Sequence, residues 1–359
     1  MRSRLAAALA ARSWEGHDGS CSDSSSPTQS RLGSAAVAFL SWWSLHAAEA
    51  ARPAEGARTV RGATALRWGE DNRGRCCHVI FPDPEGLARK RARIISDGAK
   101  HLQVISDFDF TLTKFWVNGQ RGSSCHGVIE SCGLLTEDYH RRAIALKNHY
   151  YPLEVDPSLT REQQRAFMVE WVSRAHDVML TGGLTREKIE RAVREANIAL
   201  RQGHGEVFHF LEEKGIPLLV FSAGLADVLE EVLRQHTIRP VPSTIQVISN
   251  RMAFDEHGAL KAFPGKLFHV FNKMAEAVMD EPYFQSQEVR QRGNILLLGD
   301  SLGDLNMSKG LGAKEVLAVG FLNDKVEERL DKYLSLYDVV IIGDGGLQFV
   351  VDLLRELGD

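Results

Sequence analysis

The chain has 359 residues, of which 44% are hydrophobic and 25% charged, a composition typical of a globular protein with one large or two modest domains. Its formal net charge of −4 gives no support for a surface that binds nucleic acid polymers or anionic membranes. The five cysteines, an odd number without a CxxC pair, indicate a reduced, intracellular protein. Cys125, His126 and Cys132 lack the fourth ligand that a zinc site needs.

Residues 1–85 differ in composition from the rest of the chain. Residues 1–14 contain three arginines and no acidic residue, and residues 18–34 are rich in Ser and Gly. Because such a segment cannot bury enough apolar surface to fold, we expect a low-complexity extension that is disordered or serves targeting. An uncharged run, residues 32–48, has 17 residues, fewer than the ~20 that a membrane-spanning helix needs. We therefore expect a cytoplasmic protein without stable membrane insertion, with organelle targeting or membrane association as the alternative.

Regular structure is expected from about residue 82. Residues 86–95 predict a helix, and the apolar run 102–106 predicts a strand buried on both faces of a parallel sheet. Asp107 and Asp109 follow this strand directly. Because ligands bind beyond the carboxyl ends of parallel strands, these two acids should lie at the mouth of a site.

The pair Asp107 and Asp109 needs a chemical explanation, since two unpaired carboxylates are too costly to bury for packing alone. A hard divalent cation such as Mg²⁺ would offset their repulsion and leave one oxygen free to attack a substrate. The DxD pattern also occurs in acidic turns and calcium-binding loops. Later segments of the chain therefore have to decide between a structural and a catalytic interpretation.

The next segments predict helices. Residues 115–133 are rich in Gly, Ser and Cys, which suits a mobile flap over the site. Thr136 can cap a helix that runs to about residue 150, and Thr160 with Gln163 forms a capping box before a second helix. Residues 185–201 repeat the helical spacing of apolar side chains and predict a third helix. Because no strand pattern interrupts them, they predict a helical cap inserted between two strands of the sheet.

A second strand end has features of a phosphate site. The apolar run 216–221 predicts a strand that ends at Ser222, Ala223 and Gly224, and residues 225–235 predict an amphipathic helix. The free N–H groups and the positive dipole end of that helix would favour a phosphate near Ser222. An ordinary strand-to-helix turn is the alternative, because Ser and Gly are common in such turns.

A third strand end supplies further acids. Residues 294–298 predict a strand that leads into the sequence GDSLGD, with Asp300 at its end and Asp304 one helical turn later. Both carboxylates can therefore face the same mouth as the first acidic pair. Two more apolar runs, residues 316–321 and 339–342, complete a predicted sheet of at least five strands.

One lysine is expected to balance these acids. Lys273, in the sequence FHVFNK, is placed where a cation could reach both the acids and a bound phosphate. Lys261 and Lys266 are competitors that spacing alone does not exclude.

Together these four motifs resemble those of the haloacid dehalogenase superfamily of phosphohydrolases, which has a DxD strand end, a Ser or Thr strand end, a Lys and an acidic pair, in that order. The resemblance implies an α/β fold, a haloacid dehalogenase-like Rossmannoid parallel sheet with an inserted helical cap. We expect residues 86–114 and 206–359 to form the catalytic core, and residues 115–205 to form the cap.

The resemblance narrows to the cytosolic 5'-nucleotidase III family from about residue 88 to the C-terminus. It rests on the segments DFDFTLT, HYYPLEVDPSLT, MVEWVSRAH, FSAGLADVLEEVLRQ, HVFNK, LLLGDSLGDL and GFLNDKVEERLDKY. The resemblance implies Mg²⁺-dependent hydrolysis of nucleoside 5'-monophosphates, either pyrimidine nucleotides such as UMP and CMP, or 7-methyl-GMP, or both.

The same resemblance implies a role for each motif residue. Asp107 would be the nucleophile that forms an aspartyl-phosphate, and Asp109 the general acid and base. Mg²⁺ would be held by Asp107, the backbone carbonyl of Asp109 and the side chain of Asp300, with Asp304 in support. The phosphate would be held by donors from two segments, namely Ser222, Ala223, Gly224 and Lys273.

Selection of the base is assigned to the cap. Glu154 matches the family's cap carboxylate that contacts the base, and it could accept hydrogen bonds from ring or exocyclic N–H groups. Trp171 and Ala175 share one helix face, so that an aromatic plate lies beside a small residue. Pyrimidine-selective members carry Ser where Ala175 stands, which weakens the case for a strict pyrimidine enzyme. Trp171 could stack on a cationic methylated purine, or it could simply belong to the core of the cap.

Three alternatives stay open at the level of sequence. The phosphoryl group could pass to a nucleoside hydroxyl instead of water, which would make the protein a phosphotransferase. The substrate could be another small phosphomonoester such as phosphoserine. The fold could also serve only as a non-catalytic nucleotide-binding module, although the intact acidic motifs argue against this. In each case a small-molecule partner and a monomeric protein are expected.

Overall fold

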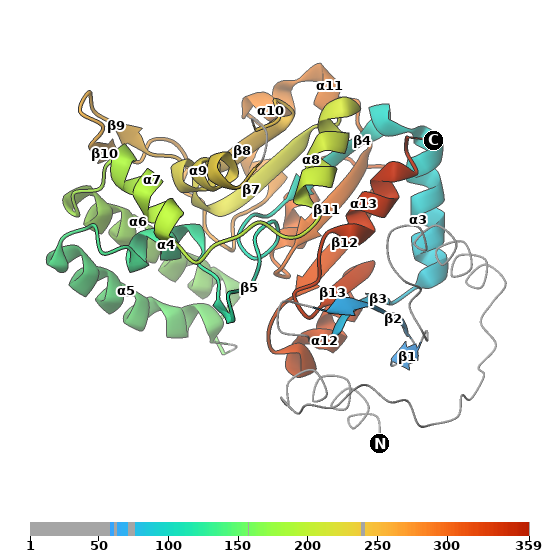
Figure 1. Cartoon of the computed structure of the whole chain (residues 1–359), viewed down its shortest axis with the longest axis horizontal. Helices are drawn as coiled ribbons and strands as arrows, with labels where there is room; N and C mark the ends of the chain where they lie inside the picture. Colours follow the sequence, from blue (N-terminus) through green and yellow to red (C-terminus); the bar gives the residue numbers. More distant parts are fainter. Residues whose placement is uncertain (1–57, 61–62, 71–75, 157, 238–240, 359) are drawn as a thin grey trace.

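The computed structural model describes residues 58–60, 63–70, 76–156, 158–237 and 241–358. Its centre is a nine-stranded sheet with the strand order β1-β2-β3-β13-β12-β11-β4-β7-β8 (Figure 1). Six strands run parallel: β4 (Leu102–Ser106), β7 (Leu218–Leu225), β8 (Ile245–Asn250), β11 (Asn294–Gly299), β12 (Glu315–Leu322) and β13 (Val339–Ile342). Three strands extend the sheet in antiparallel pairing: β1 (Arg58–Val60), β2 (Ala63–Glu70) and β3 (Cys76–Phe81).

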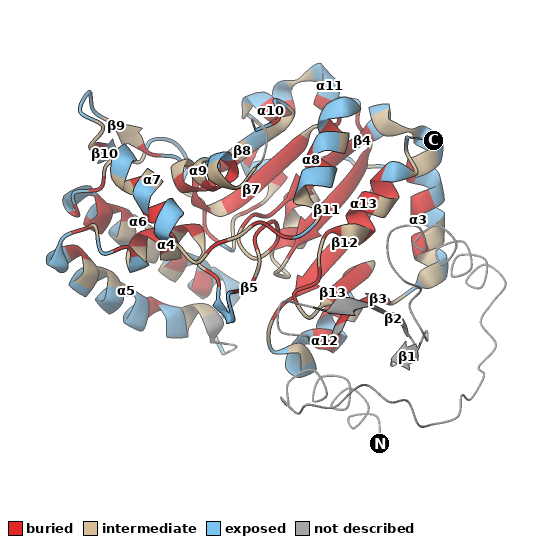
Figure 2. Ribbon diagram, viewed as in Figure 1, coloured by how far each residue is buried: buried red, intermediate tan, exposed pale blue. Residues whose placement is uncertain are grey.

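Helices cover both faces of the sheet, because its parallel strands are apolar on both sides (Figure 2). Leu296 and Leu298 of β11 pack into a core with α3 (Pro84–Asp97), α8 (His204–Glu213), α9 (Ala226–His236) and α13 (Gln348–Arg355). Ile295 and Leu297 point to the other face, toward the 3₁₀ helix η2 (Ala275–Val278), α10 (Pro282–Gln285), α11 (Gln287–Arg290) and α12 (Val326–Leu334). The alternation follows from the two-residue period of a strand.

The register of the central strands determines where the motifs meet. Strand β4 lies between β11 and β7, with Leu297 beside Ile105 and Ile105 beside Leu219. The three strands are parallel, so their carboxyl ends meet at one edge of the sheet. The acids after β4, the Ser222 segment and the GDSLGD sequence are therefore brought together, as expected from the sequence.

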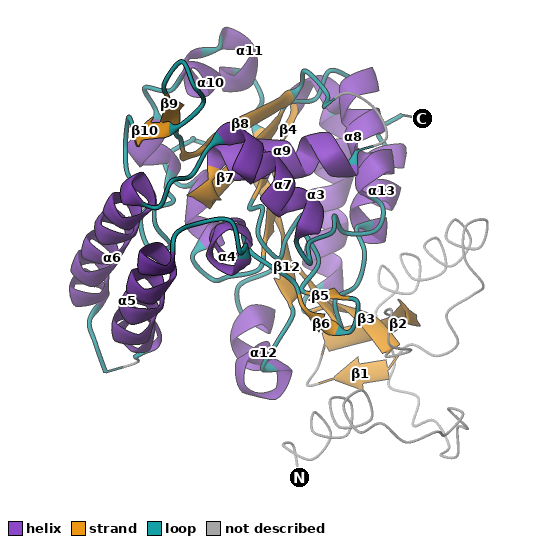
Figure 3. Cartoon of the chain, turned by 60° about the vertical axis from the view of Figure 1, so that its left-hand side comes forward, coloured by secondary structure: helices purple, strands orange, loops and turns teal. Residues whose placement is uncertain are grey.

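The cap is built mainly from two long helices, α5 (Glu137–Val155) and α6 (Arg161–Thr181), which lie side by side away from the sheet (Figure 3). Both predicted starts are confirmed: the Thr136 side chain caps α5, and Thr160 with Gln163 forms the capping box of α6. The hairpin β5 (Trp116–Val117) and β6 (Gln120–Arg121) and the helix α4 (Cys125–Ser131) precede α5. The hairpin β9 (Ala253–Phe254) and β10 (Leu260–Ala262) follows β8 in the chain, and β10 contacts α6.

The third predicted helix is shorter than expected. It is α7 (Arg186–Glu195), and the chain then runs back in extended form to a bridge between Leu200 and Thr113. The prediction of a helix to residue 201 is therefore wrong at its C-terminal end. The apolar side chains of α7 face α9, and those of residues 198 and 200 lie in the same core cluster.

The prediction for residues 1–85 is wrong at its C-terminal end. Strand β3 pairs with β13, with Val79 beside Ile341, and Val79 and Phe81 are buried. The sequence analysis did not assign a strand to the short apolar run of β3, because this run follows a polar segment that contains two glycines. Residues 1–57, with the predicted targeting segment and the uncharged run 32–48, lie outside the described residues. No helix in the described part of the chain is long and apolar enough to cross a membrane.

Candidate active site

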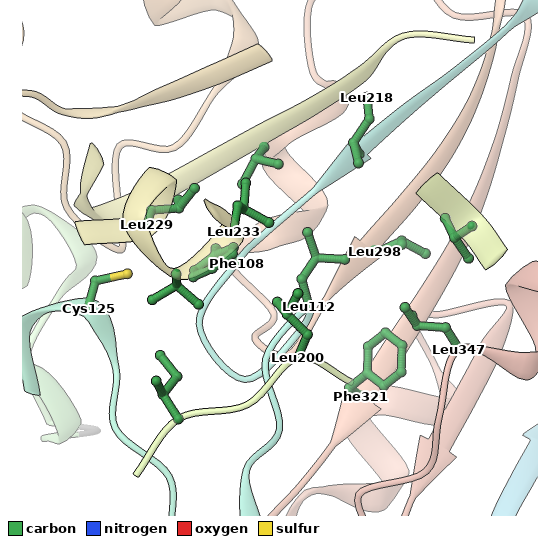
Figure 4. Packing of buried hydrophobic residues seen from close by; sticks show 14 of the residues in the cluster. Phe108, Leu112, Cys125, Leu200, Leu218, Leu229, Leu233, Leu298, Phe321 and Leu347 are labelled. Carbon is green, nitrogen blue, oxygen red and sulfur yellow. The ribbon is translucent and has the colours of Figure 1, made fainter. Parts of the chain in front are cut away.

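The acids after β4 are presented by a loop anchored in the core. Phe108, between Asp107 and Asp109, is fully buried and packs in the cluster that also contains Leu112 and Leu298 (Figure 4). Burial of the middle residue turns the two flanking carboxylates away from the apolar cluster. The backbone N–H of Asp107 donates to the Leu298 carbonyl at 3.0 Å, which continues the parallel ladder one residue past the strand.

Lys273 joins two of the acids, as predicted. Its Nζ lies 2.6 Å from Asp107 Oδ1 and 2.7 Å from Asp304 Oδ1, and its side chain is only 4% exposed. The competing lysines lie elsewhere, because Lys261 is an exposed residue of β10 and Lys266 is paired with Asp280 at the surface.

Asp304 and Asp300 differ in their contacts. The second oxygen of Asp304 accepts hydrogen bonds from the backbone N–H and the hydroxyl of Ser301, both at 2.9 Å, so both of its oxygens have partners. The backbone carbonyl of Asp300 accepts from the Tyr333 hydroxyl. The Asp300 carboxylate has no hydrogen-bond donor among the described residues. Both of its oxygens are therefore available to bind a metal ion.

Three carboxylates form a potential metal site: Asp107, Asp300 and Asp304 each offer an oxygen, and these atoms lie within 4.8 Å of one another. Carboxylate oxygens are the ligands of hard cations such as Mg²⁺. The residues therefore fit the predicted metal, although the cluster includes Asp304, which the sequence assigned to support.

Charge is unbalanced in this cluster. Burial raises the pKa of Asp107 to about 7, although Lys273 acts to lower it, and the neighbouring Asp304 adds to the rise. The pKa of Asp300 is raised well above its usual range by burial, and then by Asp107 and Asp304. One lysine does not compensate the two buried acids Asp107 and Asp304 and the half-buried Asp300, so a further cation is favoured here.

Asp109 faces the start of the cap. The backbone N–H of Cys125, at the first turn of α4, donates to Asp109 Oδ1 at 2.9 Å. Burial is the largest effect on this carboxyl and raises its pKa. Asp109 also lies close to Gly224, where an added Cβ would be 3.2 Å from Asp109 Oδ2. The DxD loop and the Ser222 segment therefore line the same space.

The Ser222 segment differs from its predicted form. Strand β7 continues through it to Leu225, and α9 begins only at Ala226. Strand β8 holds it there, since Asn250 Nδ2 donates to the carbonyls of Ala223 and Gly224 at 3.0 and 3.1 Å. The Gly224 N–H donates to Ser222 Oγ at 3.0 Å, so one N–H expected to face phosphate has an internal partner.

The cap residues lie apart from the acids in sequence and element. Glu154 is on α5, half-buried, and burial raises its pKa. Trp171 and Ala175, both half-buried, lie on α6 as predicted. The Trp171 ring stacks on Tyr150, with centroids 5.9 Å apart and planes at 14°. One face of the indole is therefore covered by the protein.

The sequence analysis missed three groups that shape the site. Cys125 acts through its backbone N–H, for which no side-chain pattern exists. Ser301 and Asn250 hold Asp304 and the Ser222 segment. Ser301 could have been found, because it lies inside the GDSLGD sequence between the two acids. Asn250 ends a strand that was not predicted and had no such pattern.

Several known proteins are similar in sequence to this chain. A family profile described as "Pyrimidine 5'-nucleotidase (UMPH-1)" matches residues 110–358. The 7-methylguanosine phosphate-specific 5'-nucleotidase A of Xenopus laevis is 42% identical over 278 residues, which cover 77% of this chain and 94% of the relative. The human 7-methylguanosine phosphate-specific 5'-nucleotidase is 41% identical over 280 residues, covering 78% and 92%.

A solved structure agrees with the sequence relatives. The crystal structure of cytosolic 5'-nucleotidase IIIB bound to cytidine aligns with a TM-score of 0.71 and 29% identity, and covers 78% of this chain and 93% of that one. The extent of these matches, together with the buried acids and lysine at the strand ends, establishes that the chain belongs to the pyrimidine 5'-nucleotidase family and is a 5'-nucleotidase with a haloacid dehalogenase-type fold.

Proposed function

We propose that the protein hydrolyses nucleoside 5'-monophosphates in a Mg²⁺-dependent reaction, with pyrimidine nucleotides such as UMP and CMP, or 7-methyl-GMP, or both, as substrates. The observation that carries this proposal is the cluster of Asp107, Asp300 and Asp304, in which Lys273 pairs with Asp107 and Asp304. Relatives named for 7-methylguanosine phosphate, and the family profile named for pyrimidine nucleotides, support the two substrate classes. Bound Mg²⁺ would supply the positive charge that keeps the acids ionised and offsets charge on the phosphoryl oxygens.

Asp107 is the proposed nucleophile. Its Oδ1 is held by Lys273, while Oδ2 has only a long contact of 3.4 Å with the Thr111 hydroxyl. Oδ2 is therefore free to attack phosphorus in line as the bond to the nucleoside 5'-oxygen breaks, which forms an aspartyl-phosphate and releases the nucleoside.

Asp109 is the proposed acid and base. Its raised pKa favours the protonated form that donates a proton to the departing 5'-oxygen. The resulting carboxylate then accepts a proton from the water that attacks the aspartyl-phosphate, and inorganic phosphate leaves. The Cys125 N–H holds one oxygen of Asp109 and so fixes the orientation of the other.

Phosphate oxygens would be bound by Lys273, the Ser222 hydroxyl and the backbone N–H of Ala223. Gly224 contributes mainly through its missing side chain, because an added Cβ would crowd Asp109 and Ser222. Preorganised donors of this kind stabilise charge that develops on the transferring group.

The base would bind in the cap, on the indole face of Trp171 that Tyr150 leaves uncovered. A 7-methylguanine ring is cationic, so stacking would add a cation–π contribution of ~0.5–2 kcal/mol. Glu154, which is half-buried, would accept hydrogen bonds from the base. The small side chain of Ala175 would leave room for the base.

Other expectations stay predictions. Transfer of the phosphoryl group to a nucleoside hydroxyl would use the same residues, and phosphoserine is the alternative substrate of another chemical class. The family membership argues against the non-catalytic nucleotide-binding module. A cytoplasmic location, organelle targeting or membrane association through the extension, and a monomeric state are likewise open to test.

The test is phosphate release with Mg²⁺ from UMP, CMP, GMP, AMP, 7-methyl-GMP and phosphoserine, with Asp107→Asn and EDTA in parallel. We expect release from pyrimidine or methylated guanine nucleotides that disappears in both controls. Added nucleoside in the same assay detects phosphotransfer as a new monophosphate. If the folded protein with Mg²⁺ releases no phosphate from any of these nucleotides, the proposal is wrong.

A further inference from the structure

A buried arginine lies beside the catalytic loop and has no place in the chemistry proposed so far. Arg201 is fully buried, and its guanidinium packs over the Phe321 ring at 4.3 Å. Its donors reach three parts of the chain that are distant in sequence. They meet the carbonyls of Thr111 at 2.8 Å, Phe110 at 2.7 Å and Gly345 at 2.6 Å, and the side chains of Asp344 at 3.0 Å and Asn323 at 3.2 Å.

Two of these partners directly follow Asp109. Phe110 has a φ of 63°, a left-handed conformation that a bulky side chain rarely adopts. Its carbonyl accepts from both Arg201 and Asn323 Nδ2, the latter at 2.9 Å. Strained backbone of this kind persists only where the surroundings hold it. Arg201 therefore holds the loop in the conformation that presents Asp109.

The ion-pair partner of Arg201 holds the next part of the loop. Asp344 Oδ1 accepts from the Phe115 N–H at 2.9 Å, and Oδ2 from the Trp116 N–H at 3.0 Å. Residues 110–116 form the first connection between core and cap. One buried ion pair, 3.0 Å long, is thus bonded to the start and the end of this connection.

The second connection between core and cap, which contains Ala199 and Arg201, is hydrogen-bonded to the first connection. The Arg201 N–H donates to the Leu112 carbonyl at 2.7 Å, and the Lys114 N–H donates to the Ala199 carbonyl at 2.9 Å. The two connections therefore run beside each other over the Arg201 side chain. Any movement of the cap relative to the core therefore has to displace these two hydrogen-bonded segments.

Stability alone is a poor explanation for this arrangement. A buried ion pair often adds no net stability over well-packed apolar residues, because both charges lose their hydration. Burial indeed lowers the pKa of the Arg201 guanidinium despite Asp344. Arg201 donates to the carbonyls of Phe110 and Thr111, and the position of these residues determines the position of Asp109.

We propose that Arg201, together with Asp344, is a positioning residue for Asp109, which fixes the loop after the nucleophile and links it to both connections of the cap. This proposal rests on the proposed function, since it concerns the group that protonates the leaving oxygen. Its loss should lower kcat, while KM changes little because Lys273, Ser222 and the cap still bind the nucleotide.

The chain offers a matched control in Arg292. It is also buried and donates to the carbonyls of Ala99, Leu102 and Gly215 at 2.7 to 2.8 Å. These carbonyls lie at the amino ends of β4 and β7, the edge of the sheet opposite the acids. Arg292 therefore resembles Arg201 in burial and bonding but not in location.

The test compares Arg201→Met, Arg201→Lys and Arg292→Met with a nucleotide that the wild type hydrolyses. We expect kcat to fall about 30-fold or more in Arg201→Met with KM within about threefold, because misplacement by about 1 Å can cost 10²-fold. Arg201→Lys should recover part of this loss. Arg292→Met should lose stability but keep kcat within about twofold.

Amide hydrogen exchange supplies a readout that does not depend on activity. Exchange in residues 110–116 should be faster in Arg201→Met than in wild type, and unchanged there in Arg292→Met. A wild type that hydrolyses no nucleotide would remove the proposed function, and exchange would still test the link between Arg201 and the loop.

Three results would overturn the inference: kcat unchanged in folded Arg201→Met, an equal loss of kcat in Arg292→Met, or unchanged exchange in residues 110–116. Arg201→Met leaves Asp344 buried without its partner, so the double variant Arg201→Met/Asp344→Asn is measured beside it. Should neither fold, Arg201→Lys decides, with a fall in kcat of about threefold or more at unchanged KM as the expected result.

Discussion

Asp300 is the acid of the site with the fewest protein contacts. It is surrounded by Asp107 and Asp304, and its carboxylate has no hydrogen-bond donor in the described part of the chain. Without metal the ionised form is therefore destabilising. We expect Asp300→Asn to unfold at a temperature about 2–4 °C above wild type in EDTA, as about 1 kcal/mol would give for a domain of this size.

Mg²⁺ should reverse the order of the unfolding temperatures of wild type and Asp300→Asn. Added Mg²⁺ should raise the unfolding temperature of wild type but raise that of Asp300→Asn much less, because a ligand that binds only the folded state stabilises it. Thermal unfolding with Mg²⁺ and with EDTA measures both effects. Glu256→Gln, which changes an exposed acid, should behave as wild type. Equal stabilisation of wild type and Asp300→Asn by Mg²⁺ would contradict the metal site.

Trp171 determines base selection if one of its faces is covered by Tyr150 and the other by the base. Trp171→Leu should raise KM for 7-methyl-GMP by about 2- to 30-fold, since the cation–π contribution is ~0.5–2 kcal/mol. KM for CMP should rise less, because cytosine carries no charge. Val169→Ala, at an exposed position of the same helix, controls for general damage to α6. A rise of equal size for both nucleotides would place Trp171 in the cap core only.

At the scale of elements, α6 contains a buried histidine that should make the cap sensitive to acid. His176 stacks on Phe263, with centroids 3.8 Å apart, and its Nε2 has no hydrogen-bond partner among the residues that the structure describes. Burial, and to a lesser extent His126, lowers the pKa of His176 to about 3. Between that value and the usual 6.5 the unfolded chain binds a proton that the folded protein does not, so stability falls as pH drops from 6.5 toward 3.

His176→Phe should keep the stack and remove this pH dependence. Its free energy of unfolding should fall less than that of wild type between pH 7 and pH 5, measured by urea titration at each pH. The exposed His101 serves as a control, because His101→Gln should keep the wild-type slope. Parallel curves for wild type and His176→Phe would show that His176 is not held neutral by the fold.

The elements also differ in how far the sequence predicts them. The starts of α5 and α6 were predicted because Thr136 and the Thr160–Gln163 box act within one turn of the chain. The hydrogen bonds that hold the end of β7 were not predicted, because they come from Asn250 on the neighbouring strand. Local patterns thus predict elements whose causes are local, and they miss those fixed by partners distant in sequence.

At the scale of the whole molecule, the site is the meeting point of segments about 200 residues apart in the chain. Their convergence was predictable, because parallel strands with polar ends deliver their residues to one edge. The Arg201 contacts were not predictable, since Arg201 was placed at the end of the third predicted helix and most of its partners are backbone carbonyls. Side-chain motifs therefore predicted the reacting groups, and tertiary structure was needed for what positions them.

The sheet as a whole depends on β3, which sequence analysis assigned to the extension. Val79, Ile80 and Phe81 are buried, and full burial of such side chains stabilises by about 1.5–3 kcal/mol each. We expect a variant that begins at Asp83 to unfold or aggregate, because it loses this burial and exposes β13 as an edge strand. A variant that begins at Cys76 keeps β3 and should unfold within a few degrees of the full chain. Thermal unfolding and light scattering compare the two, and equal unfolding temperatures would show that β3 only covers a core that is complete without it.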